Sequence, residues 1–401
     1  MKGASMKPVI AIICNTALHV HRCRTTLIGA LQACGAQILL ISPRDASVPA
    51  LERMGVIHEH VEISQYGTNP LQEGAAYFAI RAALRRHRPT VCLCYTIKAN
   101  TIGALAAQAL NIPVINNIAG TGRAFDGGGR LRRAFFISLY AKALRRSVRV
   151  FFQNTDDLQF FLEQGMVDKD LARHIPGSGV NLERFTPTPD FPEEAVFLYV
   201  GRLLISKGAQ MFIDAAEAMT RRGTSARFVI AGERLEESGY VRAEALEAFA
   251  SQDQCSYLGQ VPPGEIAALL RSCSVLVLPS YYGEGVPRTL LEAGAVGRPI
   301  ISTDSVGCRD IIRHRVNGLR IAPRDQAELL AAMWEMAQMD AGTLQRLGRQ
   351  NREIVEREFD EHIVIRAYLD ECARLLADFG PADAQAPAAR LAPAGESGPC
   401  A

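Results

Sequence analysis

Two basic side chains stand close together after an apolar run in the middle of the chain. The segment Val196–Val200 has the pattern of a strand buried on both faces, and GRLLISKG follows it. Arg202 and Lys207, five residues apart in that segment, would together neutralise a diphosphate. The segment is not a Walker A loop, which needs GxxxxGK followed by Ser or Thr. Two solvated cations at the end of a strand are the alternative interpretation.

A glycine-bearing loop and a helix start follow a second apolar run, in residues 275–299, VLVLPSYYGEGVPRTLLEAGAVGRP. VLVLP predicts a buried strand, and Pro287 favours the first turn of a helix, where its missing N–H costs nothing. The first amides of a helix lack helical partners, and the helix dipole adds about half a positive charge there. The pattern therefore predicts an anion site at the amides of Arg288, Thr289 and Leu290.

Two carboxylates flank this predicted anion site. Glu284 lies in the loop, and Glu292 lies about one turn inside the helix. Carboxylates repel an anion, but they would suit a ligand that carries sugar hydroxyls on either side of its phosphates. The alternative is an ordinary strand-to-helix connection with solvated acidic side chains.

Strands and helices alternate through the first half of the chain. We expect strands at 9–14, 37–42, 56–63, 90–95, 113–116 and 149–153. We expect helices between them at 26–34, 74–88, 101–110 and 131–146. This alternation predicts a doubly wound parallel sheet of the α/β class, in which ligands bind beyond the carboxyl ends of the strands. The loops at those ends are 15–25, which holds His19 and His21, 96–100 and 117–129.

A second α/β run follows a proline-rich linker at 185–194, FTPTPDFPEE. Strands are expected at 196–200, 228–231, 255–258, 275–279 and 299–302, and helices at 209–221, 241–250, 264–271 and 326–338. We therefore expect two α/β domains of similar size with a deep cleft between them. The residues from Pro381 onward are rich in Ala, Pro and Gly, and we expect them to be disordered.

Composition narrows the class of protein and its partners. No run of about 18 apolar residues is present, so no membrane-spanning helix is expected, and the apolar N-terminal run fits a first strand better than a signal peptide. Ten cysteines without a CxxC pair indicate a reduced, cytosolic protein without a zinc site. Residues 1–185 carry 22 Lys and Arg against 12 Asp and Glu, whereas residues 186–401 carry 22 against 30. The basic first half predicts a phosphate-rich or anionic partner.

Taken together, these segments resemble the retaining GT-B glycosyltransferases of family four. The matching segments, in the family's order and spacing, are GRLLISKG, VIAGE, YLGQVP, VLPSYYGEGVPRTLLEAGAVGRPII and GCRDIIRHRVNGL. The first half is similar to the subgroup that builds bacterial capsule, exopolysaccharide and O-antigen units, through YTIKANTIGALAA, IPVINNIAGTGRAF, FFQNTDDLQFFLEQG and IPGSGVNLERF. The resemblance runs from about Val9 to Phe379.

The resemblance implies a GT-B fold of two Rossmann-like domains. Residues 1–190 would bind the acceptor, 191–359 the nucleotide-sugar, a return helix at 360–379 would pack on the first domain, and 380–401 would be a tail. The implied reaction moves a hexose or N-acetylhexosamine, with retention of configuration, from a nucleotide-sugar, expected to be UDP-linked, to a polyprenyl-diphosphate-linked saccharide. No metal, cofactor or nucleic acid is expected, and Asp156–Asp157 is interpreted as a helix cap rather than as a metal-binding DxD motif.

The resemblance also assigns roles to residues. Arg202 and Lys207 would hold the donor diphosphate, Glu284 would contact the transferred sugar, and Glu292 would bind the ribose hydroxyls. The amides of 285–290 would surround the sugar and phosphates, and the other donor-side residues are Gly201, Gly232, Glu233, Gly285, Val286, Pro287, Arg288, Thr289 and Leu290. Candidate acceptor-side residues are Thr16, His19, Lys98, Asn117, Gly120 and Arg123. The subgroup commonly has NNITGLGYVF where this chain has NNIAGTGRAF, so the identity of the acceptor is not carried over.

A basic segment in the first half suggests a membrane surface. Residues 130–149, RLRRAFFISLYAKALRRSVR, hold seven cations and no acid, and we expect them to dock on anionic lipid at the inner face of the plasma membrane. Alternatively, the apolar residues of this segment pack on the sheet and leave only the arginines outside; they are Phe135, Phe136, Leu139, Tyr140 and Leu144. Three other functions are open: a GT-B UDP-sugar 2-epimerase, a glycosyltransferase with a soluble acceptor, and a non-catalytic nucleotide-sugar-binding scaffold.

Overall fold

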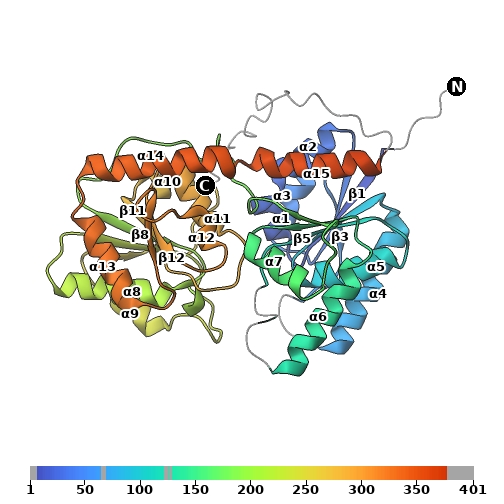
Figure 1. Cartoon of the computed structure of the whole chain (residues 1–401), viewed down its shortest axis with the longest axis horizontal. Coiled ribbons are helices and arrows are strands. Elements are labelled where there is room, and N and C mark those ends of the chain that lie inside the picture. Colours follow the sequence, from blue (N-terminus) through green and yellow to red (C-terminus); the bar gives the residue numbers. More distant parts are fainter. Residues whose placement is uncertain (1–6, 65–68, 122–124, 126–128, 377–401) are drawn as a thin grey trace, which may run out of the picture.

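The structure is a computed structural model that describes residues 7–64, 69–121, 125 and 129–376. The tail expected at 380–401 and the candidate Arg123 therefore lie outside the described residues. Two parallel sheets, each with helices on both faces, stand side by side (Figure 1). The prediction of an α/β fold with two doubly wound domains is confirmed.

The first sheet has seven strands in the order β3-β2-β1-β4-β5-β6-β7. They are β1 (Val9–Ile13), β2 (Gln37–Ser42), β3 (Ile57–His60), β4 (Val91–Tyr95), β5 (Val114–Ile118), β6 (Arg149–Phe152) and β7 (Ala172–His174). The helices are α1 (Ala17–Cys23), α2 (Thr25–Ala33), α3 (Val48–Arg53), α4 (Pro70–His87), α5 (Ala104–Gln108), which continues a π-helical turn at Ala99–Gly103, α6 (Arg130–Leu144) and α7 (Thr155–Glu163).

The second sheet has six strands in the order β10-β9-β8-β11-β12-β13. They are β8 (Val196–Val200), β9 (Arg227–Ala231), β10 (Cys255–Tyr257), β11 (Val275–Leu278), β12 (Ile300–Thr303) and β13 (Gly318–Ile321). The helices are α8 (Ala209–Arg221), α9 (Ala243–Ala250), α10 (Ile266–Arg271), α11 (Arg288–Ala295), α12 (Cys308–Ile311), α13 (Gln326–Ala337), α14 (Ala341–Glu358) and α15 (Glu361–Leu375).

Successive side chains of β1 enter different cores because a strand presents alternate residues to opposite faces. Ile10 and Ile12 join a cluster that includes residues of α1, α2 and α15, whereas Ala11 and Ile13 join one that includes residues of α4 and α5. All of these β1 side chains are buried, which agrees with the continuous apolar run expected of a parallel strand covered on both faces.

The last two helices connect the domains. In Figure 1, α14 lies over the second sheet, and α15 continues nearly in line with it over the first sheet. Val364, Tyr368 and Cys372 of α15 are buried in the cluster that contains Ile10 and Leu40. The last helix of the described chain therefore packs on the first domain.

Two helix starts in the first domain differ from the sequence predictions. The stretch 15–25, expected to be a loop, contains α1, whose first turn is capped by the Thr16 hydroxyl accepting from the Leu18 amide at 3.2 Å. The cap of α7 is Asn154, whose side-chain oxygen accepts from the Asp157 amide at 2.7 Å, so Asp156 and Asp157 lie in the first turn instead of capping it. In both cases a short polar side chain satisfies amides that a helix start leaves open.

Strand order fixes where a ligand can bind. In each sheet the order reverses between two neighbouring central strands, β1 and β4 in the first sheet and β8 and β11 in the second. Helices leave such a point in opposite directions and open a crevice at the carboxyl ends of the strands. The loops that follow these strands hold Thr16 and Lys98 in one domain and Arg202 and Glu284 in the other.

Candidate active site

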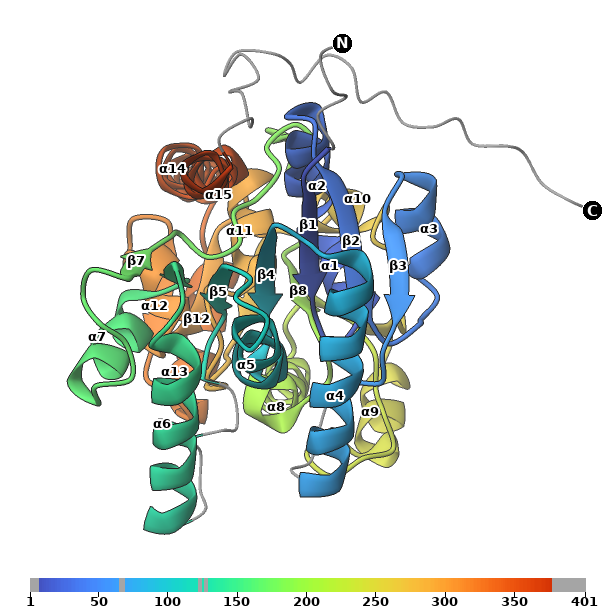
Figure 2. The same ribbon diagram turned by 90° about the vertical axis from the view of Figure 1, so that its right-hand side faces the viewer.

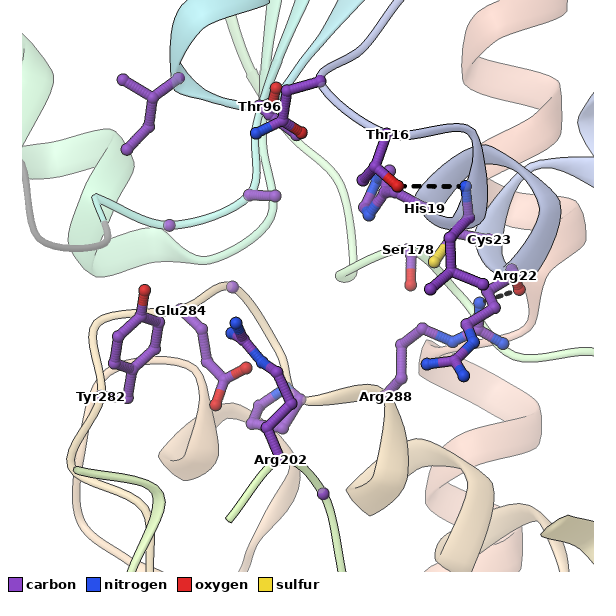
Figure 3. Close-up of a pocket in the computed structure, with 18 of the residues that line it drawn as sticks. Thr16, His19, Arg22, Cys23, Thr96, Ser178, Arg202, Tyr282, Glu284 and Arg288 are labelled. Atoms are coloured by element: carbon purple, nitrogen blue, oxygen red, sulfur yellow. Dashed lines mark hydrogen bonds between the residues drawn. The ribbon is translucent and has the colours of Figure 1, made fainter. Parts of the chain in front are cut away.

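A cavity of about 1580 Å³ lies between the two domains, and strand-end loops of both domains line it. In Figure 3, Arg202 and Glu284 of the second domain point into it, and Thr16, His19 and Thr96 lie on the opposite side. Most residues predicted from the sequence to bind the donor line this one cavity; they are Gly201, Arg202, Lys207, Gly232, Glu233, Glu284, Gly285, Val286, Pro287, Arg288, Thr289 and Glu292.

The GRLLISKG segment is held in place by its backbone. The hydroxyl of the buried Tyr199 donates to the Arg202 carbonyl at 3.0 Å, and the Leu203 amide donates to the Glu233 carbonyl at 3.0 Å. A 3₁₀ turn at Ile205–Lys207 then directs Lys207 into the cavity. The hydrogen bonds from Tyr199 and Leu203 therefore fix the main chain of the segment.

Lys207 and Glu284 meet in an ion pair. Lys207 Nζ lies 3.0 Å from Glu284 Oε2, and both side chains keep less than a fifth of their surface exposed, 15% and 19%. The Ser280 hydroxyl also donates to Glu284 Oε1 at 3.4 Å. Because an ammonium group has three donors, Lys207 can hold this carboxylate and an anionic ligand together. The sequence placed both residues in the site but did not predict their contact.

The start of α11 offers fewer amides than predicted. The Leu290 amide donates to the Pro287 carbonyl at 3.0 Å, and the Leu290 side chain is fully buried, so its predicted contact with the donor is wrong. The Gly285 amide is also used, since it donates to the Ala119 carbonyl of the first domain at 2.8 Å. Arg288 and Thr289 are the first two residues of the helix, and their amides have no acceptor inside it.

Arg288 links Glu292 to the first domain. Its guanidinium lies 3.0 Å from Glu292 Oε1 and donates to the Arg22 carbonyl of α1. Arg22, Arg184 and Arg288 together line a small polar cavity of about 60 Å³ beside the main one. Sequence analysis did not identify Arg22 or Arg184, because α1 was expected to be a loop and Arg184 precedes the predicted linker.

The acceptor-side candidates divide into residues that line the cavity and residues that do not. Thr16, His19, Lys98 and Gly120 line it. Asn117 is 1% exposed and donates to the Tyr368 hydroxyl at 2.8 Å, so it is a buried structural residue and its predicted contact with the acceptor is wrong. Lys98 forms an ion pair with Glu73 of α4 and also donates to the Ser64 hydroxyl.

His19 is neutral at physiological pH. Burial, together with the positive charges of Arg24 and Arg288, lowers its pKa to about 3. Its Nε2 atom is buried and has no hydrogen-bond partner among the described residues. A neutral imidazole with an unused nitrogen at a cavity wall can exchange hydrogen bonds with a sugar hydroxyl.

Metal ligands are not grouped in the part of the chain that the structure describes. Within those residues, no set of three or more His, Cys, Asp or Glu side chains has the arrangement of a metal site. The charged groups on the second-domain side of the main cavity include Arg202, Lys207, Glu284, Arg288 and Glu292.

Family models match both halves of the chain. Residues 20–177 match the Glycosyl transferase 4-like domain, and residues 183–354 match Glycosyl transferases group 1. The chain is therefore a glycosyltransferase with the GT-B fold. Its first domain is a glycosyl transferase 4-like domain, and its second is a glycosyl transferase group 1 domain.

Several characterised proteins are similar to the chain. It is 25% identical, over 90% of its length and 97% of the relative, to the N,N'-diacetylbacillosaminyl-diphospho-undecaprenol alpha-1,3-N-acetylgalactosaminyltransferase of Campylobacter jejuni. It is 28% identical to the amylovoran biosynthesis glycosyltransferase AmsK of Erwinia amylovora, over 57% of this chain and 58% of that protein. The Anabaena HepE structure with UDP and glucose has the same fold, with a TM-score of 0.75 at 18% identity, covering 92% of this chain and all of HepE.

Proposed function

We propose that this protein is a retaining glycosyltransferase that moves a hexose or N-acetylhexosamine from a UDP-sugar to a polyprenyl-diphosphate-linked saccharide. The second domain binds the nucleotide-sugar, and the first binds the acceptor. The observation that carries the proposal is the gathering of Arg202, Lys207, Glu284 and Glu292 around one cavity between the domains. Such transfers build the repeating units of capsules, exopolysaccharides and O-antigens.

The charges in the cavity suit departure of a nucleoside diphosphate. As the bond from the sugar C1 to the phosphate oxygen breaks, negative charge grows on the diphosphate and positive charge on the sugar ring. Arg202, Lys207 and the N-terminus of α11 stabilise the negative charge, and the Glu284 carboxylate stabilises the positive charge. These cations are the groups that we propose neutralise the diphosphate, so that no metal ion is required.

Retention follows if the acceptor hydroxyl attacks from the face that the diphosphate leaves. The new bond joins the acceptor oxygen to C1, and the hydroxyl proton passes to the departing phosphate oxygen. Such an attack needs the acceptor on the first-domain side of the donor, where Thr16, His19 and Lys98 line the cavity. We propose this front-face route through an oxocarbenium-like state.

A lipid-linked acceptor is supported by the relatives and by the surface beside the cavity. The Campylobacter relative acts, by its name, on a sugar linked to diphospho-undecaprenol. In this chain the cavity wall includes Pro70 and Glu73 of α4 and Arg132 and Phe135 of α6. Figures 1 and 2 both show α4 and α6 extending from the first domain on the side away from α15.

We propose that the N-terminal halves of α4 and α6 form a membrane-docking surface, the α4–α6 surface. It carries four exposed apolar side chains, Leu71 (84%), Phe78 (65%), Leu131 (89%) and Phe135 (60%). Arg130, Arg132 and Arg133 lie beside the last two and supply positive charge for anionic lipid on the inner face of the plasma membrane. No helix among the described residues is long and apolar enough to cross a bilayer.

Part of the basic segment faces inward. Phe136, Tyr140 and Leu144 are buried in the first domain. Arg149 lies in β6 and forms an ion pair with the buried Glu371 of α15, with Nε 2.9 Å from Oε1. The proposed surface is therefore the N-terminal half of α6 with α4, rather than the whole of 130–149.

The proposal is tested by an assay of the purified protein against UDP-, GDP- and dTDP-sugars. Nucleotide release is followed with and without an undecaprenyl-diphosphate-linked monosaccharide in detergent micelles. We expect release from a UDP-sugar that depends on the lipid-linked acceptor and is unchanged by EDTA. Release that needs only a water-soluble saccharide would replace the lipid acceptor with a soluble one, and epimerised UDP-sugar without release would support the epimerase.

A further inference from the structure

The loop that carries Glu284 touches the first domain through its backbone. The Gly285 amide donates to the Ala119 carbonyl at 2.8 Å. Gly120 adopts φ +111°, and a Cβ atom built on it would lie 2.5 Å from Glu284 Cα and 2.7 Å from Glu284 C. Only glycine permits both this backbone conformation and this approach. We call this the 119–285 contact.

The second domain supports the same loop from behind. Gly307, at the start of α12, packs directly on the Gly285 carbonyl, with no space for a Cβ atom between them. The backbone of Glu284 and Gly285 therefore lies between Gly120 of one domain and Gly307 of the other. A loop that is held on both sides has little freedom to move its carboxylate.

A buried chain of amide and hydroxyl groups extends this contact into the first domain. Gln153, which follows β6, packs against Gly285 and donates through Nε2 to Asn117 Oδ1 at 2.8 Å. Asn117 in turn donates to the Tyr368 hydroxyl of α15 at 2.8 Å. All three side chains are buried, so each hydrogen bond is costly to break and the group keeps one arrangement.

We propose that Gly120 and Gln153 of the first domain are positioning residues, which hold Glu284 in its place beside Lys207 through the 119–285 contact. The inference rests on the proposed function, because it assigns Glu284 to the transferred sugar. Its consequence is that the acceptor-binding domain completes the catalytic loop of the donor-binding domain. Glu284 reaches its working position only when the two domains meet at this contact.

The test compares two alanine substitutions at glycines with positive φ. Gly120→Ala inserts a Cβ into the 119–285 contact, whereas Gly35→Ala, at φ +90° with no atom within 4 Å of the built Cβ, imposes similar backbone strain alone. We expect Gly120→Ala to lower kcat at least about tenfold, because small displacements of catalytic groups cost one to two orders of magnitude. UDP affinity and the KM for the donor should stay within about twofold, because the cations that hold the diphosphate are untouched.

Hydrogen exchange supplies a measurement that needs no substrate. We expect peptides covering 281–287 to exchange faster in Gly120→Ala than in the wild type or Gly35→Ala, because the Gly285 amide loses its acceptor. If Gly120→Ala keeps both wild-type exchange there and wild-type kcat, the inference is wrong. If instead the wild type turns over no nucleotide-sugar, the proposed function fails while the exchange result still tests the contact.

A second variant serves if Gly120→Ala does not fold. Gln153→Ala removes the side chain that packs against Gly285 and takes one hydrogen-bond donor away from Asn117 Oδ1. We expect the same pattern, namely faster exchange at 281–287 and reduced kcat with unchanged UDP affinity. Wild-type values for all three measurements would overturn the role assigned to Gln153 and, with it, the coupling between the domains.

Discussion

At the scale of single residues, the site is a set of charges held by main-chain contacts. The ion pair between Lys207 and Glu284 is 3.0 Å long and little exposed, so the medium screens it less than it would a surface pair. Arg288 and Glu292, both in the first turns of α11, form a similar ion pair, with Nη2 3.0 Å from Oε1. Each carboxylate thus has a cation beside it that can also contact a phosphate.

Removing either cation of the GRLLISKG segment should slow turnover far more than it weakens the fold. We expect Arg202→Ala and Lys207→Ala each to lower kcat about 100-fold or more, because the charge that develops on the leaving diphosphate loses a partner. Arg222→Ala, at the exposed C-terminal end of α8, is the matched control and should leave kcat unchanged. Near-wild-type kcat in either site variant would contradict the assigned diphosphate role.

Glu292→Gln should weaken binding of the nucleoside diphosphate. A charged acceptor for two ribose hydroxyls becomes a neutral one, which we expect to cost roughly 1.5–3 kcal/mol in titration calorimetry with UDP. The variant also removes the charge that faces Arg288, so titration with UMP and uridine is run in parallel. A ribose role predicts a similar loss for uridine, whereas an effect acting through Arg288 would appear only with the phosphates.

The sequence predicts which residues belong to the site better than it predicts the contacts of each side chain. Arg202, Lys207, Glu284 and Glu292 line one cavity, and the sequence singled them out because their segments match those of a known family in order and spacing. Leu290 and Asn117 were assigned wrongly because a motif gives the position of a residue but not the partners of its amide or side chain. The Leu290 amide donates a hydrogen bond to the Pro287 carbonyl. The Asn117 side chain donates to the Tyr368 hydroxyl and accepts from Gln153 Nε2.

At the scale of elements, most strands could be predicted because parallel strands are continuous apolar runs bounded by glycine, proline and polar residues. β2 and β8 have the predicted bounds, Gln37–Ser42 and Val196–Val200. Some short elements were not predicted. The strand β7 has three residues and is partly exposed, and the helix α1 has seven residues, of which few are apolar. Such elements form because their neighbours support them, which a local pattern cannot reveal.

The contact between α7 and α12 is another place where elements of the two domains meet. Arg309 of α12 forms an ion pair with Asp156 of α7, with Nη1 3.3 Å from Oδ1. Burial and the negative charge of Asp156 raise the pKa of the neighbouring Asp310 to about 6, although the positive charge of Arg309 opposes the shift. Its Oδ2 atom is buried and has no hydrogen-bond partner among the described residues. The folded protein therefore carries an unfavourable charge at Asp310 above pH 6.

Asp310→Asn should stabilise the protein at neutral and alkaline pH much more than at pH 4. The folded-state pKa is raised above the ordinary value, so ionisation of Asp310 costs stability progressively as the pH rises from about 4 to above 6. After allowance for its partial exposure, we expect a gain of about 1–2 kcal/mol in the free energy of unfolding at pH 8. Urea unfolding at pH 4 and pH 8 checks this, and an equal gain at both values would rule out titration as the cause.

At the scale of the whole molecule, the points where the strand order reverses in the two sheets lie on opposite sides of one cavity. The helices α14 and α15 connect the two domains. Sequence reasoning reached this architecture because the alternation of strands and helices is repeated twice with a proline-rich linker between. It could not reach the contacts across the cavity, such as the 119–285 contact, because these depend on how two separately folded sheets are oriented. The exposed apolar residues of α4 and α6 could not be predicted either, because they depend on which faces of these helices pack on the first domain.

Membrane docking should depend on both parts of the α4–α6 surface. In sedimentation with liposomes, we expect the triple change of Arg130, Arg132 and Arg133 to Gln to lower the partition coefficient roughly 100-fold at about 1 kcal/mol for each cation. Leu131→Ser with Phe135→Ser should lower it at every salt concentration, because the apolar contribution is not screened. Ile363→Ser, an exposed apolar position on α15 (41%), is the matched control and should bind like the wild type. Binding that ignores lipid charge and salt would contradict electrostatic docking.

Analysis of the product of one purified reaction tests the proposed transfer most directly. The protein is incubated with an α-linked UDP-sugar and an undecaprenyl-diphosphate-linked monosaccharide, and the lipid fraction is examined by mass spectrometry and NMR. We predict a gain of one sugar residue with an α-linkage, equal in amount to the UDP released and greatly reduced in Lys207→Ala. A β-linkage would contradict retention, and UDP release without a heavier lipid-linked product would contradict transfer to this acceptor.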